Sequence, residues 1–142
     1  MTAPTAPPAP LRRAALWALW VGSLALLSYG LLSPDPPKVG EEYVPSPLRF
    51  WVSKAVHVGG YAYLSALAGF LSLSFRGEAG LRLALVAHGG LTEYLQTFVE
   101  GRYGSVEDVA IDTAGVILGW GLVLLWRRLH RRGRSPSPPA PP

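Results

Sequence analysis

The chain has 142 residues, of which 49% are hydrophobic, with a net charge of +4, 14 prolines and no cysteine. This length fits one domain. The absence of cysteine excludes thiol catalysis, zinc–thiolate sites, disulfides and palmitoylation. Residues 1–10 and 135–142, rich in Pro, Ala, Thr and Ser, have the composition of disordered tails.

Four apolar segments follow one another along the chain, and each is close to the roughly 20 residues that cross a bilayer core as a helix. They cover residues 14–32, 56–75, 83–99 and 109–126. Every proline lies outside them, and the first is apolar all round, unlike an amphipathic helix of a soluble bundle. We therefore expect an all-α, integral-membrane four-helix bundle. Its membrane domain spans 14–126, and residues 1–13 and 127–142 form its tails.

A cleaved signal peptide is the alternative for the first segment, because Arg12 and Arg13 precede an apolar run. That run is longer than the usual signal-peptide core of roughly 7 to 15 residues, and no A-x-A-like cleavage site follows it. We expect the segment to be retained as a helix.

The distribution of lysine and arginine predicts the orientation of the bundle. Most of these residues lie before the first segment, between the second and third, or after the fourth: Arg12, Arg13, Arg76, Arg82, Arg127, Arg128, Arg131, Arg132 and Arg134. Because cytoplasmic loops carry the basic excess, both termini are expected to be cytoplasmic. The positive charge then reflects topology and contact with anionic membrane lipid, and no nucleic-acid partner is expected.

Polar residues gather at the face that this topology makes extracytoplasmic. They are Lys54, His57, Tyr61, Glu93, Gln96, Arg102, Asp108 and Asp112. An ionisable side chain at the centre of a span costs roughly 2.5 to 3.5 kcal/mol on insertion scales and usually has a partner or a water-filled cavity. We therefore expect Glu93 and Asp112 to have Arg102, Lys54 or His57 as partners.

Helix periodicity directs these residues towards the interior of the bundle. At about 100° per residue, Lys54 and His57 share one stripe of the second segment. Asp112 shares a stripe of the fourth segment with Gly115 and Gly119, a small-xxx-small pair that allows close helix packing. The polar stripe of the fourth segment is therefore expected to face its neighbours.

The order and spacing of these residues resemble the VanZ-like family of small bacterial membrane proteins. The likeness covers roughly residues 28–126 and is carried by Lys54-x-x-His57-x-x-x-Tyr61, Glu93-x-x-Gln96, Gly101-Arg102 and Asp108-Val-x-x-Asp112-x-x-Gly115. The chain departs from the family pattern at Ser53, Glu100 and Asp112, where Asp, Pro and Asn are usual. The resemblance implies a multi-pass protein of the bacterial cytoplasmic membrane and cell envelope, with a link to glycopeptide antibiotic tolerance.

Three functions are open for this polar group. It could bind the anionic headgroup of a membrane lipid or a lipid-linked cell wall precursor, with Arg102 meeting phosphate through its planar fork. It could be the site of a membrane-embedded hydrolase or transferase, with His57 or Glu93 as general base. The hydroxyls available there are Ser105 and Thr97. It could also be purely structural, and a binding or structural role is favoured over catalysis.

Neither a metal ion nor a cofactor is expected. Possible metal ligands exist at His57, Glu93, Asp108 and Asp112. However, no HExxH-type spacing is present, and cationic side chains are expected in the same region. His88 lies about 140° around its helix from Glu93, and we expect it to form an interhelical hydrogen bond.

Overall fold

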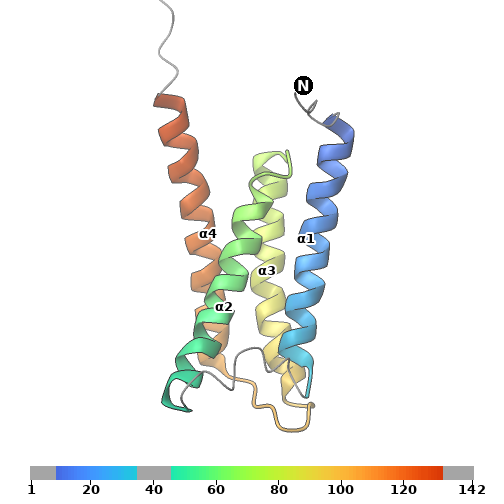
Figure 1. Cartoon of the computed structure of the whole chain (residues 1–142), viewed down its shortest axis with the longest axis vertical. Coiled ribbons are helices and arrows are strands. Elements are labelled where there is room, and N and C mark those ends of the chain that lie inside the picture. Colours follow the sequence, from blue (N-terminus) through green and yellow to red (C-terminus); the bar gives the residue numbers. More distant parts are fainter. Residues whose placement is uncertain (1–8, 35–45, 133–142) are drawn as a thin grey trace, which may run out of the picture.

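The computed structural model describes residues 9–34 and 46–132. These residues form four helices, which are α1 (Ala9–Leu32), α2 (Ser46–Ala68), α3 (Phe75–Gln96) and α4 (Val106–Arg132). Within the described ranges there is no strand, so the predicted all-α four-helix fold is confirmed. The helices alternate in direction, and the first turn of α1 lies at the same end of the bundle as the last turn of α4 (Figure 1).

All four helices begin earlier in the sequence than the predicted segments, and residues 9–13 and 127–132, predicted as tails, are helical. α2 begins at Ser46 instead of Val56, and Pro47 is compatible with its first turn because the N–H groups there have no intrahelical partner. α3 begins at Phe75, where the Ser74 side chain caps the helix by accepting a 3.2 Å hydrogen bond from the N–H of Gly77. The predicted segment 56–75 also runs past the end of α2 at Ala68, so apolar composition located part of each helix but not its ends.

α2 and α4 approach each other closely through glycines. A Cβ atom on Gly115 would lie 2.5 Å from the carbonyl oxygen of Val58, and one on Gly119 would lie 2.1 Å from that of Ala62. No side chain fits at either distance. The predicted small-xxx-small contact is confirmed, and it sets the separation of the two helices that carry most of the polar residues.

Hydrogen bonds between helices reinforce the apolar core. The Trp20 indole of α1 donates to the Leu64 carbonyl of α2 at 3.1 Å, and the Ser65 hydroxyl donates to the Val116 carbonyl of α4 at 2.7 Å. The core cluster contains Trp20, Leu31, Tyr61, Leu64, Ala68, Leu71, Leu85 and Val116. All four helices therefore share one core.

The outer surface is apolar. Pro10–Leu32 and Val106–Arg131 are long and apolar enough to cross a membrane, by length and composition. Only 11% and 28% of their apolar windows are buried, whereas the core helix of a soluble protein would be mostly buried. Leu26 and Leu83 are each 70% exposed. Among the described helices, α2 and α3 do not meet this criterion, so spans at those positions stay a prediction.

Candidate functional site

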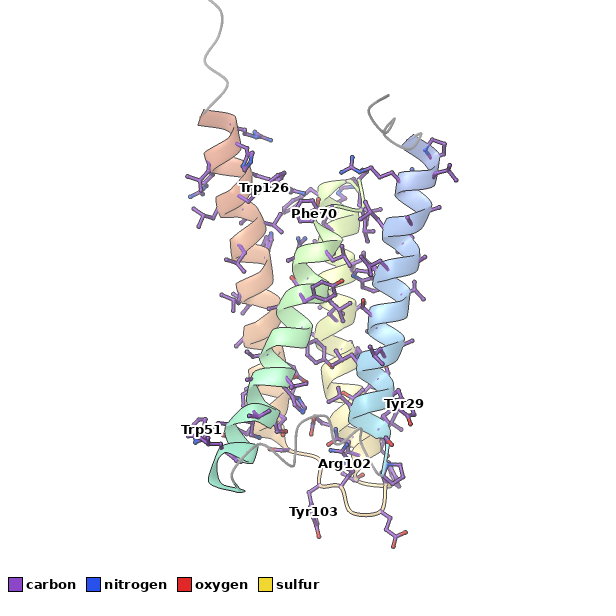
Figure 2. All side chains as sticks on the ribbon, in the orientation of Figure 1. Tyr29, Trp51, Phe70, Arg102, Tyr103 and Trp126 are labelled. Carbon is purple, nitrogen blue, oxygen red and sulfur yellow. The ribbon has the colours of Figure 1, made fainter. Side chains whose placement is uncertain are left out.

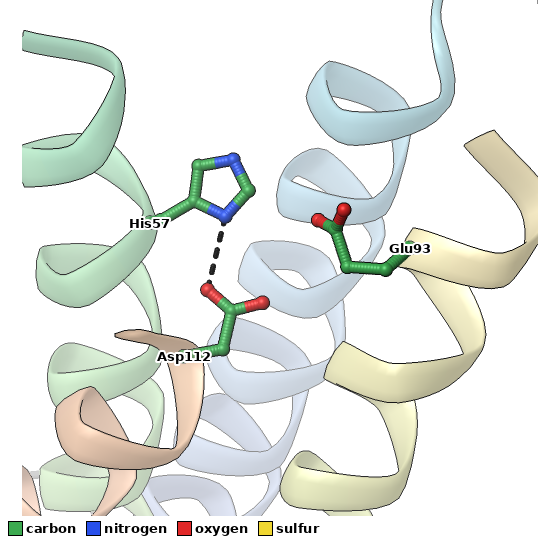
Figure 3. A group of neighbouring side chains, drawn as sticks. All are labelled: His57, Glu93 and Asp112. Atoms are coloured by element: carbon green, nitrogen blue, oxygen red, sulfur yellow. Dashed lines mark hydrogen bonds and ion pairs between the residues drawn. The ribbon is translucent and has the colours of Figure 1, made fainter. Parts of the chain in front are cut away.

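Three ionisable side chains meet inside one end of the bundle, each from a different helix (Figure 3). His57 comes from α2, Glu93 from α3 and Asp112 from α4. The Nδ1 atom of His57 lies 3.0 Å from Oδ1 of Asp112, so of the three partners expected for the buried acids, His57 is the one that Asp112 contacts. One nitrogen or oxygen atom from each of the three residues lies within 4.8 Å of the others. We call this group the buried triad, and the end that holds it the site end.

Both carboxylates of the buried triad have an oxygen without a hydrogen-bond partner. Glu93 is 3% exposed and Asp112 is fully buried. Oε2 of Glu93 accepts a 2.8 Å hydrogen bond from the N–H of Ser105, whereas its Oε1 and Oδ2 of Asp112 have no partner. A buried charged oxygen left without a partner is costly. These two atoms are therefore the acceptors in the cluster that the described residues leave unpaired.

Glycines provide the space around these acids. A Cβ atom on Gly89 would lie 3.2 Å from Oδ2 of Asp112. Gly104 lies against the carbonyl of Glu93, where a Cβ atom would approach to 2.0 Å, and this contact holds the loop before α4 against α3. The same loop presents the Ser105 N–H to the Glu93 carboxylate. The local packing thus fixes how Glu93 points.

Lys54 and Asp108 form an ion pair between α2 and α4 at the edge of the site. Their side chains are 18% and 14% exposed, so this pair is more accessible than the buried triad. The ammonium of Lys54 is therefore engaged by Asp108 and not by Glu93 or Asp112. Asp108 shares the polar stripe of α4 but stands outside the triad.

Arg102 does not pair with the buried acids, contrary to the sequence-based expectation. Its Nε donates to the Ser33 carbonyl at 3.0 Å, and its Nη2 donates to the Gly30 carbonyl at 2.9 Å. The last carbonyls of a helix lack intrahelical partners and carry partial negative charge, so they attract a cation. Arg102 binds the C-terminal end of α1 and holds the 97–105 loop beside it.

A second polar chain runs deeper between the helices. The Tyr61 hydroxyl is 2.9 Å from Nδ1 of His88, whose Nε2 is 2.9 Å from the Ser28 hydroxyl. The interhelical hydrogen bond predicted for His88 is confirmed, and it joins α1, α2 and α3. Tyr61 therefore has a partner within the bundle, and Gln96 is also buried, one turn beyond Glu93 on α3.

The hydroxyl groups of Thr97 and Ser105, near the site, form hydrogen bonds with the backbone. Thr97 donates to the Tyr94 carbonyl of its own helix at 2.6 Å. The Ser105 hydroxyl accepts the N–H of Glu107 at 3.2 Å, as expected of a residue that caps α4. In neither of these hydrogen bonds does the hydroxyl donate to a side-chain base, the contact that activates a serine or threonine nucleophile.

An ionic cluster at the opposite end was missed by the sequence analysis. Glu78 accepts from Arg127 at 2.6 Å and from Arg82 at 3.2 Å. Arg127 also donates to the Gly69 carbonyl at 2.7 Å, and Arg82 lies over the Trp120 ring. The i,i+4 spacing of Glu78 and Arg82 was the available signal. Nothing in the sequence pattern pointed to Arg127 as the third member.

These features define a small helical membrane protein with a polar cluster buried at one end. The VanZ/LLP1 family model matches residues 20–127, a range that includes every residue of the buried triad. The chain therefore belongs to the VanZ/LLP1 family. A search of curated proteins and a search of solved structures found no match.

Proposed function

We propose that this protein binds the phosphate-bearing headgroup of an envelope lipid at its site end. The observation that carries the proposal is the depth of the polar cluster. Tyr29, Trp51 and Tyr103 are exposed at that end, while Phe70 and Trp126 are exposed at the other (Figure 2). Tyr and Trp concentrate at membrane interfaces, so the buried triad lies just inside the level of the lipid headgroups.

The proposal includes the topology predicted from sequence. All four helices span the bacterial cytoplasmic membrane, both termini are cytoplasmic, and the site end faces outward. A lipid-linked cell wall precursor presents its phosphates at that face. A role in glycopeptide antibiotic tolerance rests on the same ligand, because those antibiotics act on such precursors.

Two described cations at the site end suit a phosphate ligand. Lys54 is partly exposed and can exchange its contact with Asp108 for a phosphate oxygen. Arg102 donates from Nε and Nη2 to carbonyls at the end of α1, and its guanidinium has further N–H donors for a ligand. Charge-assisted hydrogen bonds of this kind are stronger than neutral ones. Gln96 and Tyr61 lie deeper and support the site from within the bundle.

Native mass spectrometry of the detergent-purified protein tests the proposal. The probe is a polyprenyl pyrophosphate, and the matching polyprenol controls for binding of the tail alone. We expect the pyrophosphate to be retained preferentially, and Lys54→Gln together with Arg102→Gln to weaken retention at least about tenfold through loss of charge-assisted bonds. Arg128→Gln, which removes an exposed cation at the opposite end, is the matched control.

Equal retention by wild type and the double variant would contradict the proposal and leave the polar cluster a structural role. Conversion of the pyrophosphate during incubation would instead identify a hydrolase. The His57 and Asp112 contact favours that second function, because a carboxylate that orients an imidazole is a common general-base arrangement. Turnover would then be lost in Glu93→Gln or in His57→Gln, and retained in Arg128→Gln.

A further inference from the structure

The buried triad places two carboxyl groups and one imidazole in the interior of the bundle. Its two carboxylates each have an unpaired oxygen, and both are more than nine-tenths buried. Among the described residues at the site end, Lys54 is engaged by Asp108 and Arg102 by the carbonyls of α1, which leaves His57 as the basic group beside the two acids. Buried charges in proteins are normally paired or coordinate a metal. The unpaired oxygens therefore indicate that a positive group completes the site.

We propose that His57, Glu93 and Asp112 hold a divalent transition-metal ion. The donors are one imidazole nitrogen and two carboxylate oxygens, a set that suits Zn²⁺ or Mn²⁺ better than Mg²⁺, which prefers oxygen ligands alone. Three ligands from three helices leave further coordination positions open. Lys54 and Arg102, the cations expected in this region, lie outside the triad.

The distances between the three candidate ligand atoms fit a metal ion after small side-chain shifts. Bonds of about 2.0–2.2 Å put the ligand atoms of a bound ion roughly 3–4 Å apart. The three candidate atoms lie within 4.8 Å of one another, so side-chain shifts of about 1 Å would close them around an ion. Glu93 faces His57 and Asp112 across the space between the helices (Figure 3).

The contacts around the triad are those of a supported metal site. The Ser105 N–H holds one oxygen of Glu93 at 2.8 Å and leaves the other free for the ion. Hydrogen bonds of this kind orient metal ligands and tune their affinity. Gly89 leaves room beside Oδ2 of Asp112, where a larger residue would crowd it. A bound metal ion also gives this acidic interior the positive charge that a phosphate ligand requires. This point rests on the proposed function.

Metal binding by the full-length, tag-free protein in detergent tests the inference without any lipid. The protein is stripped with a chelator, dialysed against Zn²⁺ or Mn²⁺, and analysed for bound metal by mass spectrometry. We expect about one ion per chain, with Glu93→Gln and Asp112→Asn binding at least about tenfold more weakly, since even second-shell changes cost 10–100-fold. Glu107→Gln, which removes an exposed acid on α4, is the matched control.

A pair of neighbouring glycines gives a second test that leaves all three ligands intact. Gly89→Ala adds a methyl group 3.2 Å from Oδ2 of Asp112, whereas Gly90→Ala adds one with nothing within 4 Å. We expect weaker metal binding in the first variant alone. Substituted Co²⁺ would report nitrogen ligation by a visible spectrum that changes in His57→Gln.

The inference is overturned if the folded wild type, verified by circular dichroism, binds neither metal. It is also overturned if Glu93→Gln, Asp112→Asn and Glu107→Gln bind as the wild type does, because such binding is adventitious. Failure of lipid retention with metal binding intact would reject the proposed function alone. Lipid retention without metal would reject the metal site alone.

Discussion

The buried carboxylates at the two ends of this bundle differ in how many of their oxygens have hydrogen-bond partners. Both oxygens of Glu78 accept hydrogen bonds from arginines. Glu93 and Asp112 each keep one oxygen without a partner. A carboxylate with complete partners is typical of a structural contact between helices, whereas the unpaired buried oxygens are the observation on which the proposed metal site rests. The contrast identifies the end of the molecule where a ligand is expected.

The Glu78 cluster predicts an acid-sensitive contribution to stability. Burial raises the pKa of the Glu78 carboxyl, but the hydrogen bonds and charges of Arg127 and Arg82 outweigh it, so the pKa is lowered below its ordinary value. Glu78 lies in the first turn of α3, before the apolar segment 83–99. Its contribution is complete above the ordinary glutamate pKa of roughly 4.3 and is lost as pH falls through the folded pKa.

Unfolding by SDS, followed by circular dichroism at about pH 7 and about pH 3.5, measures this effect. We expect Glu78→Gln to destabilise the protein by about 3 kcal/mol at the higher pH, because two arginines lose a buried charged partner. The variant should also show a smaller loss of stability on acidification. An identical pH response in wild type and variant would contradict the assigned role.

At the scale of the helices, the close approach of α2 and α4 requires glycine at the positions where they touch. Carbonyl oxygens of α2 occupy the space where Cβ atoms of residues 115 and 119 would lie. These two helices carry two polar contacts, the one between His57 and Asp112 and the ion pair between Lys54 and Asp108. The distance between the helices therefore controls both contacts. The site geometry follows from this packing.

A matched pair of glycine substitutions on α4 tests this dependence. Gly119→Ala puts a methyl group 2.1 Å from the Ala62 carbonyl oxygen, while Gly121→Ala meets nothing within 4 Å. Overpacking should cost the first variant about 1–3 kcal/mol in SDS unfolding. The second should be neutral or slightly stabilised, because alanine has the higher helix propensity. Equal effects would show that α2 and α4 can separate freely.

For the whole molecule, the proposal requires the two ends of the bundle to face different compartments. The first turn of α1 and the last turn of α4 share one end, and the 97–105 loop lies at the other (Figure 1). An even number of spans follows if all four helices cross the membrane. The basic residues around α4's last turns then face the cytoplasm, as the charge distribution predicts.

Single cysteines can measure this topology, because the chain has none of its own. Tyr103→Cys introduces one at a residue that is 90% exposed at the site end, and Arg131→Cys introduces one at an exposed position near the opposite end. A membrane-impermeant maleimide should label the first in intact cells and the second only after lysis. The opposite pattern would invert the orientation and move the site to the cytoplasmic face.

The sequence by itself determined the helical fold, the close glycine contact and the level of the polar residues. These follow from apolar length and helical periodicity, which act within single helices. It did not determine that His57 is the partner of Asp112, that Arg102 binds α1, that Lys54 binds Asp108, or that Arg127 joins Glu78. Several cations and acids at one level offer alternative pairings of similar chemistry. Only the tertiary packing fixes which atoms come within hydrogen-bond distance, and that choice left Glu93 and Asp112 with unpaired oxygens.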